Sequence, residues 1–229
     1  MREIVLDTET TGLDPATGDR IVEIACEEIV NTVPTGATFH VFIDPQRDMP
    51  EEAFRVHGLS SEFLKGKPLF EEVVEDFLSF IGEAPLVIHN AEFDMRFLNA
   101  ELQRCKRSPL LMDRVIDTLG LARRKHPGSP NSLDALCARY RIDNSRRTKH
   151  GALLDSELLA EVYVELVGGR QSALVLASEI KIVEQTMIIS IEPRGEPIGP
   201  MIDNAEENAH RAFIGKMGEK ALWLKYLSQ

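Results

Sequence analysis

The order of the apolar segments limits the fold of this chain more than any other feature of its sequence. Residues 4–9, 20–30 and 38–43 have strand-like patterns, and the short polar connections between them favour an antiparallel meander. Strands that come first, followed by strands that alternate with helices, predict a mixed α/β domain. The later elements are helices over residues 51–57, 69–81, 93–105, 118–125, 132–140 and 153–167, with short strands over 85–88 and 113–116.

A glycine pair marks the expected end of this domain. Gly168 and Gly169 break the last helical pattern, so we expect the folded domain to span residues 1–169. The stretch 193–200 is rich in glycine and proline, and a last helical pattern runs over about 205–226. Residues 170–229 are therefore predicted to be a linker with a C-terminal docking helix, without a core of their own.

The overall charge narrows the class of protein. The chain has 229 residues and a net charge of -11, which argues against nucleic-acid binding through a basic surface. The same surplus of carboxylates suits a protein that holds divalent cations, since hard cations prefer oxygen ligands. Composition therefore permits a metal-dependent nuclease without itself indicating one.

The sequence also carries expectations about location. No run approaches the roughly 20 apolar residues that span a bilayer, and the N-terminus enters a strand pattern at once, with no signal peptide. Cys26, Cys105 and Cys137 are far apart and lie in apolar runs, so we expect buried thiols in a reducing compartment. We expect a cytoplasmic protein that does not bind membranes.

Two acidic residues end the first strand pattern. Asp7 and Glu9 are two residues apart, so their side chains share one face of the strand. Carboxylates held this close repel each other unless a cation lies between them. For an isolated pair of this kind, a solvated strand end is the better explanation, so the pair alone does not indicate a cation site.

Two further acids lie on apolar helix faces. Asp94 is in line with Leu98 and Leu102, and Asp155 is in line with Leu159. Either acid could simply favour a helix N-terminus. Burial of an unpaired charge is expensive, however, and a cation shared with the strand pair would explain both acids.

His150 lies shortly before the helix that carries Asp155. Gly151 allows a turn between them, so we expect His150 to lie in the loop and to face the same cavity. A histidine there titrates near neutrality and could take a proton from water beside a cation. A lone loop histidine usually has no such role, and the hypothesis depends on its acidic neighbours.

The three segments together resemble the exonuclease motifs of the DEDDh family, which has an RNase H-like fold. They read Asp-Thr-Glu-Thr-Thr-Gly over 7–12, His-Asn-Ala-Glu-Phe-Asp over 89–94 and His-Gly-Ala-Leu-Leu-Asp over 150–155. Within the family, the chain is similar to the epsilon-type proofreading subunits of bacterial DNA polymerase III, closely over residues 2–169. The connecting stretches 54–59, 131–137 and 142–145 share this similarity.

The resemblance implies a two-metal-ion site. Asp7, Glu9, Asp94 and Asp155 would hold two Mg²⁺ or Mn²⁺ ions, and His150 would be the general base. The reaction would be hydrolysis of the 3′-terminal phosphodiester bond, in the 3′→5′ direction, with release of nucleoside 5′-monophosphates.

The resemblance also implies a site for the 3′-terminal nucleotide of single-stranded or frayed DNA. Asp7, Glu9 and Asp155 would take part in this site as well. For the others, core packing is nearly as good an explanation as substrate contact. These further residues are Thr10, Leu13, Glu52, His57 and Phe93.

Two partners are implied for the C-terminal segment. The resemblance predicts that this segment binds the alpha subunit of DNA polymerase III. Gln171–Leu176 is similar to the peptides that bind sliding clamps, although it could equally continue the apolar linker. An RNA-trimming exoribonuclease and an inactive RNase H-like binding module are the alternative functions. The segment beyond residue 169 and the intact acidic and histidine positions favour the proofreading exonuclease over these two.

Overall fold

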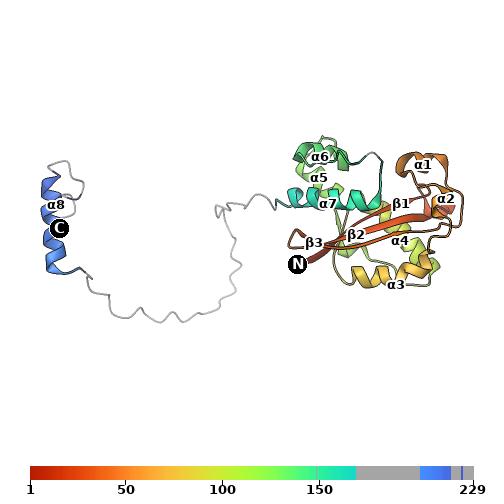
Figure 1. Cartoon of the computed structure of the whole chain (residues 1–229), viewed down its shortest axis with the longest axis horizontal. Coiled ribbons are helices and arrows are strands. Elements are labelled where there is room, and N and C mark those ends of the chain that lie inside the picture. The colour runs from red at the N-terminus through yellow and green to blue at the C-terminus, as the bar shows by residue number, and fades with distance from the viewer. Residues whose placement is uncertain (148, 169–201, 218–222, 224–229) are drawn as a thin grey trace. The chain divides into compact units, whose positions relative to one another are not determined.

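The computed structural model describes residues 1–147, 149–168, 202–217 and 223 (Figure 1). The chain forms two compact units, Met1–Val175 and Leu176–Gln229. The stretch 193–200 and the clamp-like peptide Gln171–Leu176 lie outside the described residues. In the described part of the chain, no helix is long and apolar enough to cross a membrane.

A five-stranded mixed sheet forms the centre of the first unit. Its strands lie in the order β3-β2-β1-β4-β5. β1, β2 and β3 pair antiparallel, whereas β4 pairs parallel with β1 and with β5. The predicted antiparallel meander and the mixed α/β class are therefore confirmed. The bounds are β1 (Arg2–Thr10), β2 (Ile21–Val30), β3 (Val33–Phe42), β4 (Leu86–Ile88) and β5 (Val115–Asp117).

The helices predicted for the first unit form within about two residues of their expected bounds. The four-residue α2 and the two 3-10 turns, η1 (Pro15–Thr17) and η2 (Met112–Arg114), were not predicted. The helices are α1 (Glu51–His57), α2 (Ser61–Leu64), α3 (Phe70–Ile81), α4 (Ala91–Arg104), α5 (Thr118–Lys125), α6 (Leu133–Tyr140), α7 (Ala152–Leu166) and α8 (Asn204–Lys216).

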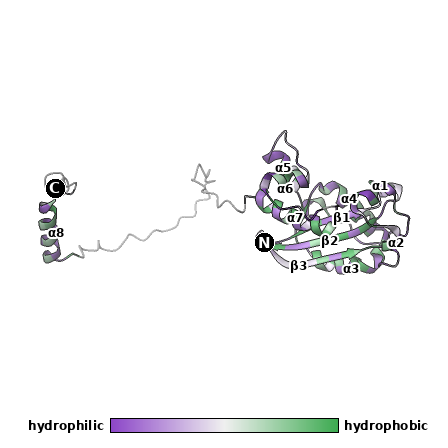
Figure 2. Cartoon of the chain, turned by 45° about the horizontal axis from the view of Figure 1, so that its top comes forward, coloured by the Kyte–Doolittle hydropathy of each residue, from purple (hydrophilic) through white to green (hydrophobic). Residues whose placement is uncertain are grey.

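Helices cover both faces of the sheet, as Figure 1 shows. Ile4 and Leu6 of β1 point to one face, where they pack with α3 and α4. Val5 points to the opposite face and packs with residues of α6 and α7. Helices on both faces allow apolar residues on both sides of a strand, and in Figure 2 hydrophobic stretches of β1 and β2 alternate with hydrophilic ones.

Strand β3 differs most from the prediction. It begins at Val33, not at residue 38, and its first residues are exposed. Pro34 and Gly36 in this stretch argue against a strand, but an edge strand tolerates them because one side of its backbone needs no partner. β3 is such an edge strand.

The described part of the second unit is a short, capped helix with its flanking residues, together with Trp223. Asp203 caps α8 by accepting hydrogen bonds from the backbone N–H groups of Ala205 and Glu206. Phe213 and Trp223 are 62% and 56% exposed. The sequence predicts a helix up to about residue 226, whereas α8 ends at Lys216 in the described part of the chain.

Candidate active site

Asp7 and Glu9 lie at the carboxyl end of β1. Glu9 is buried and Asp7 is partly buried. Burial, together with the charges of Asp94 and Glu9, raises the pKa of Asp7 well above its ordinary value. Burial and the charge of Glu23 raise the pKa of Glu9 to about 8. Both carboxyl groups therefore resist ionisation until a positive charge compensates them.

Asp94 reaches the same region from α4, which covers the face of the sheet to which Ile4 and Leu6 point. It lies in the first turn of α4, directly after the turn that follows β4, and it is 3% exposed. Burial raises its pKa to about 7, although Thr8 donates a hydrogen bond of 2.7 Å to its Oδ1 atom. Thr8 lies between Asp7 and Glu9 on β1, so this bond ties α4 to the strand that carries the other acids. The inward position predicted for Asp94 is confirmed.

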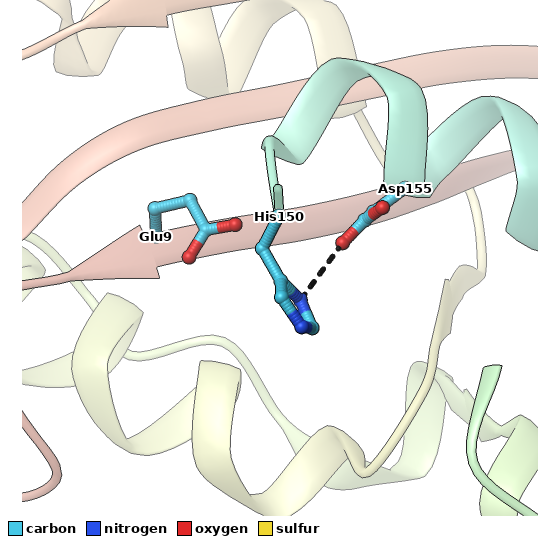
Figure 3. Close-up of side chains that lie close together, drawn as sticks. All are labelled: Glu9, His150 and Asp155. Atoms are coloured by element: carbon cyan, nitrogen blue, oxygen red, sulfur yellow. Dashed lines mark ion pairs between the residues drawn. The ribbon is translucent and has the colours of Figure 1, made fainter. Parts of the chain in front are cut away.

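His150 and Asp155 come from the start of α7. His150 lies in the loop before the helix, as predicted, and its side chain is 50% exposed. Its Nδ1 atom is 3.3 Å from Oδ2 of the buried Asp155 (Figure 3). The backbone N–H of His150 donates to the carbonyl of Val56, which holds the loop against α1. Glu9, His150 and Asp155 each offer one potential ligand atom, and these three atoms lie within 4.8 Å of one another.

The chemistry of these side chains fits a divalent cation. Carboxylate oxygens are the ligands that hard cations prefer. Asp7, Glu9 and Asp94 are crowded, and each has a raised pKa because of burial. A divalent ion would offset the cost of ionising them by adding positive charge beside the buried carboxylates.

Arg147 is a site residue that the sequence did not reveal. Its guanidinium binds both carboxylate oxygens of Asp155, with Nε–Oδ1 and Nη2–Oδ2 distances of 2.5 and 2.7 Å. Burial by itself raises the pKa of Asp155, but the two hydrogen bonds from Arg147 and the nearby imidazole of His150 outweigh it and lower that pKa. The pKa of Asp155 is thus lowered, whereas the pKa values of the three other acids are raised. An arginine in a loop gives no periodic signal from which this contact could be predicted.

Glu23 is a second residue that was missed. It is 3% exposed, and one of its oxygens lies 2.7 Å from Nε2 of His40. Its other oxygen accepts a hydrogen bond of 3.2 Å from the backbone N–H of Ala152, at the start of α7. Glu23 therefore caps the helix that carries Asp155. The sequence feature that could have revealed Glu23 is its position as an acidic residue inside the apolar run of residues 21–26.

Of the residues expected to contact a nucleotide, Thr10 and His57 are buried. Thr10 donates a hydrogen bond to the carbonyl of Gly12. His57 ends α1, and its Nδ1 accepts from the backbone N–H of Leu59 at 3.0 Å. Its Nε2 is buried and has no hydrogen-bond partner among the described residues. Burial lowers the pKa of His57.

The other three residues of this group lie nearer the surface. Phe93 directly precedes Asp94 in α4, and its ring centroid is 5.0 Å from that of Phe97. Leu13 is 78% exposed in the loop after β1. Glu52 is exposed in the first turn of α1. The nucleotide contacts of all five residues stay predictions.

Comparison with known proteins places this chain and its fold in a class. The family model described as exonuclease matches residues 4–163, which span the sheet and most of its helices. Exonuclease X in complex with 5′ overhanging duplex DNA is 26% identical, with a TM-score of 0.57, over 72% of this chain and 91% of that one. The nuclease domain of 3′hExo, a DEDDh family member bound to rAMP, has a TM-score of 0.63 at 18% identity, over 73% of this chain and 92% of that one.

A curated relative narrows the class. DNA polymerase III subunit epsilon of Rickettsia conorii is 50% identical over 222 residues, which cover 95% of this chain and 96% of the relative. The chain therefore belongs to the exonuclease family and, within it, to the DNA polymerase III epsilon subunits. The predicted family and the predicted RNase H-like fold are confirmed.

Proposed function

We propose that this chain is the proofreading 3′→5′ exonuclease of a replicative DNA polymerase. It hydrolyses the terminal phosphodiester bond at single-stranded or frayed 3′ DNA ends and releases nucleoside 5′-monophosphates. The observation that carries this proposal is the meeting of Glu9, His150 and Asp155, beside Asp7 and Asp94, in a chain of this family. We infer a cytoplasmic location, where bacterial DNA is replicated.

Asp7, Glu9, Asp94 and Asp155 are the proposed ligands of two divalent cations, Mg²⁺ or Mn²⁺. Such a pair of ions supplies an activated water and stabilises the charge that develops on the phosphate and on the leaving oxygen. Four ionised carboxylates formally balance the charge of two divalent ions. The raised pKa values of Asp7, Glu9 and Asp94 support the assignment, because burial makes each carboxylate costly to ionise and a bound cation would offset that cost.

His150 is the proposed general base. Its half-exposed ring in the loop before α7 leaves it open to water, and the carboxylate of Asp155 lies beside its Nδ1 atom. A base must come within hydrogen-bond reach of the water whose proton it takes.

The 3′-terminal nucleotide would lie beside the metal ligands. Phe93 is adjacent to Asp94 and offers an aromatic face for stacking on a base. The unpartnered Nε2 of His57 could meet a sugar or phosphate oxygen. Thr10, Leu13 and Glu52 are the remaining proposed contacts, with the exposed Leu13 as an apolar contact for a base.

The C-terminal segment is the proposed tether to the polymerase. Its described part exposes Phe213 and Trp223, and exposed large apolar side chains often mark a binding surface. The proposed partner is the alpha subunit of DNA polymerase III. Gln171–Leu176 is the proposed contact with the sliding clamp, and a labelled peptide of these residues titrated with purified clamp tests it. Absence of binding at high micromolar clamp concentration would remove this contact from the proposal.

The central experiment measures mononucleotide release from a 5′-labelled single-stranded DNA and from an RNA of the same sequence. We expect stepwise shortening of the DNA from its 3′ end with Mg²⁺ or Mn²⁺, and none with EDTA. Asp7→Ala should be inactive on both substrates. Faster digestion of the RNA would instead support the exoribonuclease alternative, and inactivity of the wild type with either metal would support a binding module.

A further inference from the structure

A buried arginine lies among the acids of the site. The side chain of Arg147 is 7% exposed, and it holds both oxygens of Asp155 in a two-point contact. Such paired hydrogen bonds between arginine and carboxylate are among the strongest in proteins. Asp155 is also one of the four proposed metal ligands. The same two oxygens therefore serve the guanidinium in this structure and a cation in the proposed reaction.

The same guanidinium reaches the proposed base. Nη2 of Arg147 lies 2.7 Å from Nδ1 of His150 and also 2.7 Å from Oδ2 of Asp155. A guanidinium only donates hydrogen bonds, so Nδ1 of His150 must accept this one. The lone pair of Nδ1 is therefore engaged by Arg147. Any movement of Arg147 away from Asp155 also changes the surroundings of His150.

Arg147 has a second anchor outside the acidic cluster. Its Nη1 atom donates to Oδ1 of Asp134 in α6 at 2.6 Å, and the side chain of Asp134 is 57% exposed. Asn144 donates to the same oxygen. Asp134 can keep the guanidinium paired when Asp155 is taken by another cation. The arginine could then leave Asp155 and still have one carboxylate beside it. A buried guanidinium with no carboxylate partner would be strongly destabilising.

We propose that Arg147 is an internal counterion that competes with the divalent ions for Asp155 and thereby sets the metal affinity of the site. The inference rests on the proposed function, because it takes Asp155 as a metal ligand. A divalent ion at Asp155 would bind the same oxygens as the guanidinium and repel it. Binding of the ion therefore displaces Arg147 from Asp155. When Arg147 withdraws toward Asp134, it also releases Nδ1 of His150, so metal binding and freeing of the base occur together.

The direct test compares the full chain with Arg147→Gln. The variant should bind Mn²⁺ about tenfold more tightly, since a charge-assisted contact no longer has to be broken, while its Tm in EDTA falls. Calorimetric titration gives the dissociation constant. Arg146→Gln is the matched control, because Arg146 is adjacent, 75% exposed and paired with Glu157. Its Mn²⁺ affinity should stay within about twofold of the wild type.

A second variant tests the opposite direction. Asp134→Asn removes the alternative anchor, so Arg147 should hold Asp155 more firmly and Mn²⁺ affinity should fall by about threefold. In the double variant with Arg147→Gln, the Asp134 change should have almost no effect, because its action passes through the arginine. Asp134 is at the surface, so this variant keeps the test available if Arg147→Gln fails to fold.

The outcomes separate the two proposals. If Arg147→Gln binds Mn²⁺ as weakly as the wild type or more weakly, the arginine merely supports Asp155 and the competition is wrong. The competition is also contradicted if Asp134→Asn weakens Mn²⁺ binding equally in the wild type and in the Arg147→Gln variant. If the wild type neither binds Mn²⁺ nor shortens DNA, it is the proposed function that fails.

Discussion

Glu9 on β1 and Glu23 on β2 lie directly opposite each other in the antiparallel ladder, and both side chains are buried. After burial, the charge of Glu23 is the largest cause of the raised pKa of Glu9, which reaches about 8. Like charges opposite each other destabilise a sheet. A sheet selected for stability alone would not keep this pair, so its presence favours a role in binding cations.

The crowded acids predict an unusual pH dependence of stability. Folding raises the pKa of Glu9 from 4.5 to about 8 and that of Asp94 from 3.8 to about 7, so the folded state binds more protons. Stability is then greatest below the ordinary carboxyl pKa values and is lost as pH rises through the raised ones. In EDTA, the Tm measured by circular dichroism should fall from about pH 5 to about pH 8. A flat or rising Tm across this range would contradict the raised pKa values.

Divalent cations should weaken this dependence, because they bind the ionised carboxylates. Added Mn²⁺ should raise the Tm more at high pH than at low pH. Equal Mn²⁺ effects at both ends of the pH range would mean that the ion binds elsewhere.

Asp7→Asn should separate activity from stability. We expect loss of nuclease activity, because a proposed ligand is gone, together with a Tm in EDTA that rises by a few degrees as the buried repulsion is removed. The exposed Asp48 offers a control: Asp48→Asn should change neither quantity. Near-normal turnover in Asp7→Asn would show that Asp7 is not a ligand.

His150→Ala should slow hydrolysis by about 10²–10⁴-fold, the usual effect of losing a general base. Mn²⁺ affinity should be largely retained, because the carboxylates carry the binding. Single-turnover rates and calorimetry measure the two effects. His210→Ala, on α8, is the control and should have the wild-type rate on single-stranded DNA. A parallel loss of metal binding in His150→Ala would make His150 a ligand instead of the base.

Truncation after residue 169 should leave nuclease activity on single strands intact and abolish co-elution with the polymerase. The sheet and α1–α7 precede this point, so the proposed site is complete without the tail. Size-exclusion chromatography with the polymerase subunit measures the complex. In the full chain, Trp223→Ala should weaken it, because the exposed indole is a proposed anchor. Co-elution of the truncated chain would place the contact on the nuclease unit.

The strongest sequence patterns predicted the fold well, and weaker ones failed for physical reasons. The helices over 51–57 and 118–125 have the predicted bounds, since proline or an acidic cap marks their starts. β3 was predicted too short, because Pro34 and Gly36 hide a strand that only its edge position permits. Where propensity and tertiary position disagree, the sequence shows only the propensity.

The same distinction applies to the site. Acids on apolar faces gave the inward positions of Asp94 and Asp155, which the structure confirms. Their roles as metal ligands stay predictions. The Arg147 contact could not be predicted, because it joins a loop arginine to Asp134 and Asp155 through geometry that no spacing encodes.

The cap that Glu23 gives to Ala152 has a consequence for the newly made chain, because the two residues are 129 positions apart. The strands β1 and β2, which carry Asp7, Glu9 and Glu23, are synthesised long before α7. His150 and Asp155 join them only after the ribosome has delivered α7. An unfinished chain that stops before this helix therefore carries some of the acids but lacks His150 and Asp155, so the proposed site stays incomplete until α7 has been made.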